Sequence, residues 1–287
     1  MTSNEPTPVC YRHPDRPTGL SCTRCGRSAC GECIRPVSVG QHCADCLAAD
    51  QAASGQTVTP REATRTPYVT YSLIAINVIV FVVCMIQAGG TDLSASTWMQ
   101  KGALITGDGL HHEYWRLLTS GFLHWSVMHV AINMISLFLI GRDLERFFGP
   151  ARYLAVYLIS LLGGSGAVML LTTEHKATAG ASGAIYGLMG ALLVVVLLAK
   201  QSPNQVIAVI VVNLVLSVSL PNISIWAHVG GLVFGMLATL AIYRLPLILA
   251  PDRRTASAVA AVGWAGIAAL AVLAIALGVG VGAGLTV

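Results

Sequence analysis

The sequence predicts an all-α polytopic membrane protein that carries a small cysteine-rich unit in its N-terminal part. Three observations indicate this fold class. Hydrophobic residues make up 55% of the 287 residues and charged residues only 10%, whereas soluble domains hold about 25% charged residues. From Tyr68 onward the chain is a series of apolar runs, each near the ~20 residues that cross a bilayer. The first 66 residues are polar, rich in arginine, and hold seven of the eight cysteines.

The polar stretch is predicted to form a zinc-binding domain at residues 1–48 and a flexible linker at 49–66. Four pairs of Cys or His, each pair separated by two residues, suit two tetrahedral zinc ions. The ligands are Cys10, His13, Cys22, Cys25, Cys30, Cys33, Cys43 and Cys46. His42 is an alternative ligand to Cys43. Fewer than 50 residues cannot build a sufficient core, so the metal would hold the fold, and disulfides are disfavoured in a reducing cytosol.

Seven apolar runs are predicted to span the membrane. Their approximate ranges are 69–88, 118–140, 152–172, 181–199, 205–220, 225–243 and 258–279. The fifth is the weakest, because it is short and holds Asn213, Ser217 and Ser219. We expect the first six to form a core at residues 67–246, and the last to be an additional C-terminal transmembrane helix within 247–287.

The basic residues predict the orientation of these helices. With the N-terminus in the cytoplasm, every Lys and Arg except Lys101, Arg116 and Lys176 falls on the cytoplasmic side, as the positive-inside rule requires. We therefore expect a multi-pass protein of the cell (plasma) membrane, in contact with the lipid bilayer, whose C-terminus lies outside. Topology explains the basic residues, so no nucleic-acid partner is expected.

Two apolar runs begin with residues that can do chemistry. The fourth opens with Gly180-Ala181-Ser182-Gly183, and the sixth opens with His228. At 1.5 Å per residue, Ser182 lies roughly 9 Å past Lys176, and His228 lies roughly 10 Å past Pro221. The two side chains are therefore predicted to share one level in the outer part of the bilayer.

A serine hydroxyl at that level becomes a nucleophile only when a base takes its proton, and His228 is the one plausible base at matching depth. No Asp or Glu lies at this level in the predicted spans, so the site would be a Ser–His dyad. His129 and Asn133 of the second span share one helix face at the same height. Together with the Ser182 backbone N–H they are candidate donors to an oxyanion. A lone membrane serine is usually a packing residue, but three helices that agree in depth favour catalysis.

The residues around this layer favour close helix contact. Gly183 and Gly187 form a small-xxx-small stripe on the fourth span, and Gly231 and Gly235 form another on the sixth. Tyr186 lies one turn below Ser182, where it can pack on an imidazole ring or simply fill space.

Taken together, these motifs resemble the rhomboid family of intramembrane serine proteases. The matching pieces, in family order over residues 68–245, are Trp115-Arg116, His124, His129-x3-Asn133, the Glu145 to Gly149 turn, Gly180-Ala181-Ser182-Gly183, and Ala227-His228-x2-Gly231-x3-Gly235. The resemblance implies a six-helix core with a short central fourth helix, an added seventh helix, and a water-filled cavity open to the outer face. It implies transmembrane protein substrates, whose single membrane segments enter laterally near span five, and hydrolysis that requires no cofactor.

The resemblance also implies a role for each site residue. Ser182 would be the nucleophile and His228 the general base. An oxyanion hole would form from His129, Asn133 and the Ser182 amide, with Tyr186 stacked on His228 and Gly180 and Gly183 in support.

The cysteine spacing resembles a B-box-type zinc finger, in which alternate pairs share a metal. That resemblance implies one site made of Cys10, His13, Cys30 and Cys33 and another made of Cys22, Cys25, Cys43 and Cys46. Such a module is more often an interaction surface than an enzyme, so we expect it to regulate the membrane domain or to recruit a cytosolic partner.

The sequence therefore predicts a serine-type endopeptidase that cleaves peptide bonds in or near transmembrane segments. The main alternative is a catalytically silent membrane scaffold that binds client transmembrane helices. A small-ion transporter ranks last, because the lower halves of spans four and six offer almost no polar path to the cytoplasm.

Overall fold

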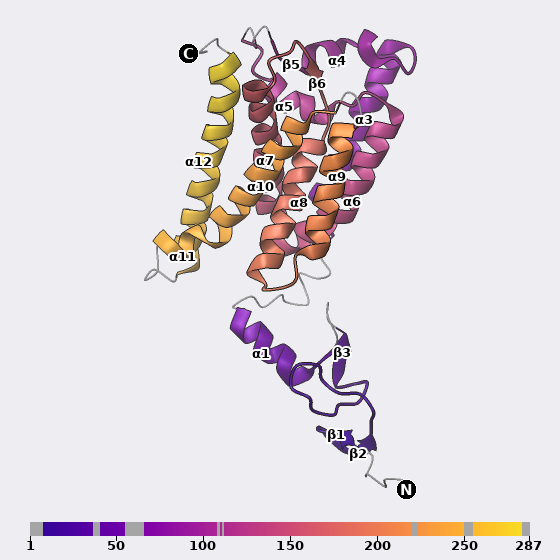
Figure 1. Cartoon of the computed structure of the whole chain (residues 1–287), viewed down its shortest axis with the longest axis vertical. Coiled ribbons are helices and arrows are strands. Elements are labelled where there is room, and N and C mark those ends of the chain that lie inside the picture. Colours follow the sequence, from indigo (N-terminus) through magenta and orange to yellow (C-terminus); the bar gives the residue numbers. More distant parts are fainter. Residues whose placement is uncertain are drawn as a thin grey trace. The chain divides into compact units, whose positions relative to one another are not determined.

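The structure is a computed structural model that describes residues 8–36, 41–54, 66–107, 110, 112–219, 223–249 and 255–282. The chain divides into two compact units, Met1–Arg65 and Thr66–Val287. Figure 1 shows that the first holds short strands and a helix, and that the second is a bundle of helices.

The N-terminal unit is built on two small antiparallel pairings. Strand β1 (Val9–Cys10) pairs with β2 (His13–Pro17), and β3 (Ile34–Pro36) pairs with β4 (Gln41–Cys43). Helix α1 (Ala44–Ser54) follows directly. It runs into the segment predicted as a flexible linker, because the alanine-rich run around residues 48–53 favours helix. Residues 55–65 of that segment lie outside the described residues.

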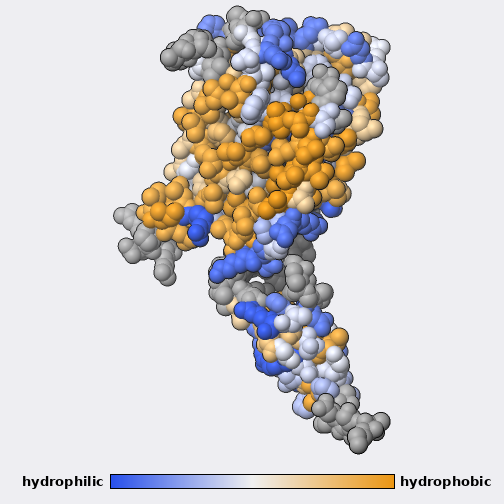
Figure 2. All heavy atoms as spheres, viewed as in Figure 1, coloured by the Kyte–Doolittle hydropathy of each residue, from blue (hydrophilic) through white to orange (hydrophobic). Residues whose placement is uncertain are grey.

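The second unit is a mostly helical membrane protein fold. Five of its described helices are long and apolar enough to cross a membrane, and two shorter ones are also apolar. The long helices are α3 (Tyr68–Ala88), α6 (Val127–Phe148), α7 (Pro150–Leu171), α10 (Ile225–Tyr243) and α12 (Ala256–Gly282), and the shorter ones are α8 (Ser182–Leu198) and α9 (Asn204–Ser219). On the face shown in Figure 2, apolar residues cover the middle of this unit and hydrophilic residues gather toward its two ends. This distribution fits a multi-pass membrane protein.

The prediction was wrong for the second span, which was placed at 118–140. Helix α6 begins nine residues later, where the Ser126 hydroxyl accepts a hydrogen bond from the His129 N–H and caps the helix. It also continues past Arg142 to Phe148. The continuation is stable because the buried Glu145 carboxylate accepts hydrogen bonds from the backbone N–H groups of Val69 and Thr70 at the start of α3. Glu145 therefore caps the N-terminus of α3, and its charge does not mark the end of α6.

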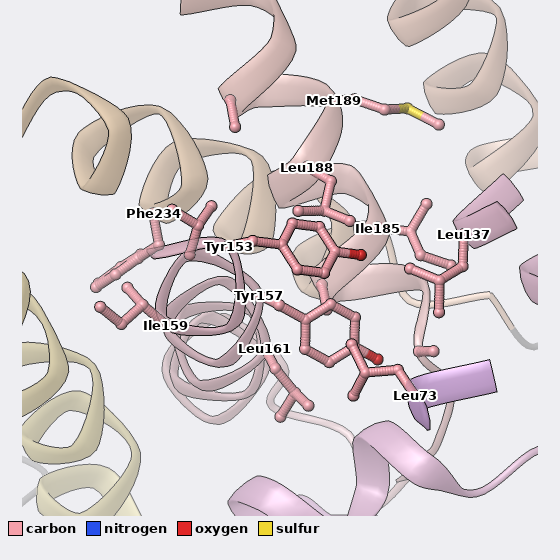
Figure 3. Close-up of a cluster of buried hydrophobic side chains, with 14 of the residues drawn as sticks. Leu73, Leu137, Tyr153, Tyr157, Ile159, Leu161, Ile185, Leu188, Met189 and Phe234 are labelled. Carbon is pink, nitrogen blue, oxygen red and sulfur yellow. The ribbon is translucent and has the colours of Figure 1, made fainter. Parts of the chain in front are cut away.

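Helix α8 lies at the centre of the bundle and packs against α10, α7, α6 and α9. Helix α12 packs on α7 and α10. The core is filled largely from α7, whose Tyr153 and Tyr157 are fully buried. Figure 3 shows both rings in the layer between Leu188 of α8 and Leu73 of α3. The short α8 is therefore enclosed on several sides, and its first turn is held within protein.

The segment between α3 and α6 is folded and contacts the approach to α8. It holds η1 (Leu93–Ala95), α4 (Thr97–Gly102), β5 (Leu104–Ile105), α5 (Arg116–Thr119) and η2 (Ser120–Phe122). Strand β5 pairs with β6 (Ala177–Thr178), which leads into α8. The buried Arg116 guanidinium donates to the carbonyls of Gln100 and Ala103 at 2.8 and 2.6 Å, which ties α5 to α4 and β5. The loop therefore braces the start of α8.

Candidate active site

The structure brings Ser182 and His228 into contact. The Ser182 Oγ and the His228 Nε2 lie 2.8 Å apart, although the residues are 46 positions apart in the chain. Ser182 is the first residue of α8, and His228 lies in the first turn of α10. His228 is buried and Ser182 is half-buried. The pair is a hydrogen-bonded hydroxyl and imidazole, the arrangement in which a histidine can remove a serine proton.

The backbone before Ser182 requires a glycine. Gly180 has φ +145°, a conformation that side-chain-bearing residues rarely adopt. Its N–H donates to the Ser120 carbonyl at 2.9 Å, which fixes the entry to α8. A Cβ at this position would lie 2.8 Å from the His129 Nε2 and 3.5 Å from the Ser182 Oγ. Gly180 thus leaves open the small space that these two side chains border.

Glycines also set the distance between α8 and α10. A Cβ on Gly231 would overlap the Gly183 carbonyl oxygen, and one on Gly235 would overlap the Gly187 carbonyl oxygen. The two backbones are therefore in direct contact just below the Ser182–His228 pair. Because this contact fixes the helix spacing, it also fixes the hydroxyl–imidazole distance.

We expect Gly231→Ala to lower any activity of the Ser182–His228 pair by about 100-fold, because a shift near 1 Å is enough for a loss of that size. Overpacking should also destabilise the bundle by about 1–3 kcal/mol. The matched control is Gly263→Ala in α12, where a Cβ would meet its nearest atom at an ordinary 3.5 Å. Cleavage rates and thermal unfolding in detergent measure both effects. Equal rates in the two variants would contradict the packing argument.

The candidate side-chain donors to an oxyanion, His129 and Asn133, both lie on α6. His129 borders the space at Gly180, and its ring meets that of His124 edge-on at 4.9 Å. The Asn133 Nδ2 is buried and has no hydrogen-bond acceptor among the described residues. An unpaired buried donor costs about 1–3 kcal/mol. The Asn133 N–H is therefore available to donate a hydrogen bond to an acceptor that binds beside it, as a donor to an oxyanion must be. The Ser182 backbone N–H lies in the first turn of α8, where such groups have no intrahelical partner.

Tyr186 and Ser217 complete the surroundings of His228. The Tyr186 ring stacks on the imidazole, with centroids 4.0 Å apart and an interplanar angle of 13°. Ser217 of α9 lies 2.6 Å from the His228 Nδ1. Ser217 is a polar residue of the weakest predicted span, and its contact with His228 is not among the predictions from the sequence. The available signal was the i, i+4 spacing of Asn213 and Ser217, which marks one polar face on α9.

A small cavity adjoins the site. Its volume is about 20 Å³, and its walls include Ser120, Thr178, Gly180 and Gly183. The rest of its lining is mostly apolar and includes Leu104, Leu161 and Val168, and its volume is enough for one water molecule. The larger water-filled cavity open to the outer face stays a prediction.

The N-terminal unit gathers its ligand candidates into two clusters. One holds Cys10, His13, Cys30 and Cys33, and the other holds Cys22, Cys25, Cys43 and Cys46. Both are the sets that the B-box resemblance implied, and the second includes Cys43 in place of the alternative His42. All eight cysteines of the chain are described, and each is a free thiol.

The spacing within the clusters fits a tetrahedral metal ion. The His13 Nδ1 lies 3.7, 3.4 and 3.5 Å from the sulfurs of Cys10, Cys30 and Cys33. In the second cluster the sulfurs of Cys25 and Cys43 are 3.8 Å apart. A tetrahedral ion with bonds of about 2.3 Å to sulfur and about 2.0 Å to nitrogen places its ligand atoms roughly 3.5–3.8 Å from one another. Either cluster can therefore hold a metal.

The backbone favours the ligating form of one cluster thiol, Cys22. Burial raises the pKa of Cys22, but backbone N–H donors outweigh it, and the pKa falls to about 6. The first of these donors is the N–H of Cys43, at 3.2 Å from the Cys22 sulfur. A thiolate is the form that binds metal, so these N–H groups favour ligation by Cys22, whereas burial raises the pKa of Cys46 in the same cluster to about 12.

Fold and site together define a multi-pass helical membrane protein with a hydrogen-bonded Ser–His pair at the start of its short central helix. Comparison with known proteins agrees. Residues 111–245 match the family described as "Rhomboid domain". This chain belongs to the rhomboid family.

Several curated proteins are homologous to this chain. It is 34% identical over 198 residues to "Rhomboid protease GluP" of Bacillus subtilis, which covers 67% of this chain and 38% of that protein. It is 38% identical over 154 residues to "RHOMBOID-like protein 1" of Arabidopsis thaliana, which covers 50% of this chain and 39% of that one. "RHOMBOID-like protein 2" of the same plant is 39% identical over 150 residues, which covers 50% of this chain and 47% of the relative. The matches thus span less than half the length of each of these three relatives.

Proposed function

We propose that the chain is an intramembrane serine endopeptidase that cleaves peptide bonds in or near transmembrane segments of membrane proteins. The observation that carries the proposal is the 2.8 Å contact between the Ser182 Oγ and the His228 Nε2 inside a membrane bundle. Homology to a relative named a rhomboid protease supports it. Domain boundaries near residues 67 and 246 for the protease core belong to the same proposal.

In the first half of the reaction, the Ser182 oxygen attacks the carbonyl carbon of the substrate peptide while its proton passes to the His228 Nε2. The carbonyl oxygen becomes an oxyanion, which accepts hydrogen bonds from the Ser182 N–H, the Asn133 amide and the His129 ring. The C–N bond then breaks. The imidazolium gives its proton to the departing amine, and an ester remains on Ser182.

In the second half, a water molecule attacks the ester carbonyl and gives a proton to the His228 Nε2. The same donors hold the second oxyanion. Its collapse releases the carboxylic acid, and the proton returns from the imidazolium to the Ser182 oxygen. Water must reach the site, and the cavity beside Gly180 and Gly183 supports its supply.

Reconstituted cleavage tests the proposal. The purified chain in liposomes, given a model substrate with one transmembrane segment, should release two fragments whose ends map to one region in or near that segment. Ser182→Ala should yield no fragments and unfold at the same temperature. Ser257→Ala, at the exposed start of α12, should cleave like the unaltered chain. A Ser182→Ala variant that still cleaves would refute Ser182 as the nucleophile. An unaltered chain that binds such substrates without cutting them would favour a silent scaffold.

For the N-terminal unit we propose two structural zinc ions, one in each Cys/His cluster, in a B-box-type arrangement. The fit of the ligand spacing to a tetrahedral ion supports zinc. We further propose that the protein lies in the cell membrane with its N-terminus in the cytoplasm. The N-terminal unit would bind a cytosolic partner there. The distribution of Lys and Arg supports that orientation.

A further inference from the structure

The imidazole of His228 has a second polar contact, on the side away from Ser182. Its Nδ1 lies 2.6 Å from the Ser217 hydroxyl oxygen. Ser217 is 3% exposed and comes from α9, whereas Ser182 and His228 come from α8 and α10. A third helix thus reaches the reacting pair through one buried side chain.

The hydrogen-bonding capacity of Ser217 decides which ring nitrogen carries the proton. A serine hydroxyl has one hydrogen and two acceptor positions. The Ser217 hydroxyl lies 2.8 Å from the Asn213 carbonyl, to which it can donate that hydrogen. While that bond is made, the hydroxyl can only accept from His228, and the Nδ1 then bears the proton. The Nε2 is left with a lone pair, and this is the nitrogen that faces the Ser182 hydroxyl.

Tyr186 fills the remaining acceptor position. Its hydroxyl lies 3.0 Å from the Ser217 Oγ and can donate to it. The Tyr186 ring is the same ring that stacks on the imidazole. Each group in this buried set therefore has a partner in one consistent pattern: Asn213 accepts from Ser217, and Ser217 accepts from His228 and Tyr186. The opposite tautomer would break the bond to Asn213 or leave an Nδ1 lone pair against an oxygen lone pair.

We propose that Ser217 is a positioning residue that holds His228 in the tautomer whose Nε2 can take the Ser182 proton. This role rests on the proposed peptidase function. Ser217 would then be an uncharged third residue that supports the Ser–His pair. Because Ser217 lies on α9, the site is complete only while α9 is docked on α8 and α10. The other described side chains of α9 are largely exposed, with Ile210 the further buried one.

The test compares Ser217→Ala with Ser217→Thr, which keeps the hydroxyl, and with Ser219→Ala. Ser219 is a matched control, since its hydroxyl also bonds the carbonyl four residues back on α9 but is exposed. Partners that orient a metal-bound histidine typically contribute about 10–100-fold, and we expect a factor of the same order for His228. Cleavage by Ser217→Ala should therefore show a kcat lower by that factor with KM within about twofold, while Ser219→Ala is unchanged and Ser217→Thr recovers most of kcat.

Nitrogen-15 NMR of histidine-labelled full chain gives a readout that loosened packing alone would not give. The His228 signal, identified by its loss in His228→Ala, should report an Nδ1–H tautomer in the unaltered chain and in Ser217→Thr. In Ser217→Ala the Nε2–H tautomer should become populated. An Nδ1–H tautomer that persists in Ser217→Ala, or a kcat within twofold of the unaltered chain, would overturn the proposal. An unaltered chain that cleaves no substrate would instead refute the peptidase function, and the NMR comparison would still test the tautomer.

Discussion

Replacing His228 with alanine is expected to lower the cleavage rate by about 10⁴-fold, because the His228 Nε2 is the base that hydrogen-bonds the Ser182 hydroxyl. The loss should appear in kcat and kcat/KM alike, since the proton transfer occurs only in the transition state. The bundle should stay folded, because α8 and α10 are held together below the site by Gly183, Gly187, Gly231 and Gly235. Steady-state cleavage of a reconstituted single-span substrate measures the effect.

The matched control for this variant is His112→Ala. His112 is an exposed histidine of the loop before α5 and has its ring beside Tyr114. Its loss should leave the rate unchanged. A rate for His228→Ala within tenfold of the unaltered chain, with thermal stability preserved, would mean that another group activates Ser182.

Removing metal from the full chain is expected to unfold residues 8–54, including α1, and leave the helices of the second unit intact. The buried core of this unit consists of Cys10, Cys22, Ala29, Cys30, Cys33, Ile34, Cys43 and Cys46. Six of its members are thiols of the two clusters, so little apolar area remains to hold the fold without an ion. Structural zinc contributes about 10–16 kcal/mol in small domains of this kind.

Limited proteolysis of the full chain, before and after a zinc chelator, measures this loss. New cleavage sites should appear within residues 8–54, while circular dichroism should lose no more than the helical signal of α1, and added zinc but not magnesium should restore protection. Cys30→Ser should behave like the chelated chain. Cys84→Ser is the control, since Cys84 is buried in α3 and belongs to neither cluster. Protection that persists after elemental analysis finds no metal would refute a metal-held fold.

Much of the site could be predicted because helix geometry is regular. A constant rise per residue placed Ser182 and His228 at one depth, and the glycine spacing indicated that their helices touch. Zinc-ligand spacing indicated the eight ligands in the same way, because each short turn carries its own two ligands, and the resemblance to a B-box-type zinc finger implied which pairs share a cluster. Six of the seven predicted ranges agree with a helix of the structure to within about three residues, since each has its own apolar run.

The misses arise from contacts between distant residues. The end of α6 depends on Glu145, whose carboxylate caps a helix that begins about 75 positions earlier. The residues next to Glu145 in the sequence do not indicate that hydrogen bonds from α3 stabilise its charge. Ser217 depends on how α9 is rotated toward α10, and the spacing of Asn213 and Ser217 marks a polar face without saying what it meets. The β5–β6 pairing that braces Gly180 is equally non-local.

The most direct measurement of the central claim is covalent labelling of Ser182 by a fluorophosphonate, a reagent that reacts with activated serines. Mass spectrometry of the labelled chain should find the adduct on Ser182, and His228→Ala should slow its formation by at least about 100-fold. An adduct on Ser182 that forms equally fast without the imidazole, or no adduct on Ser182 in the folded chain, would contradict the account.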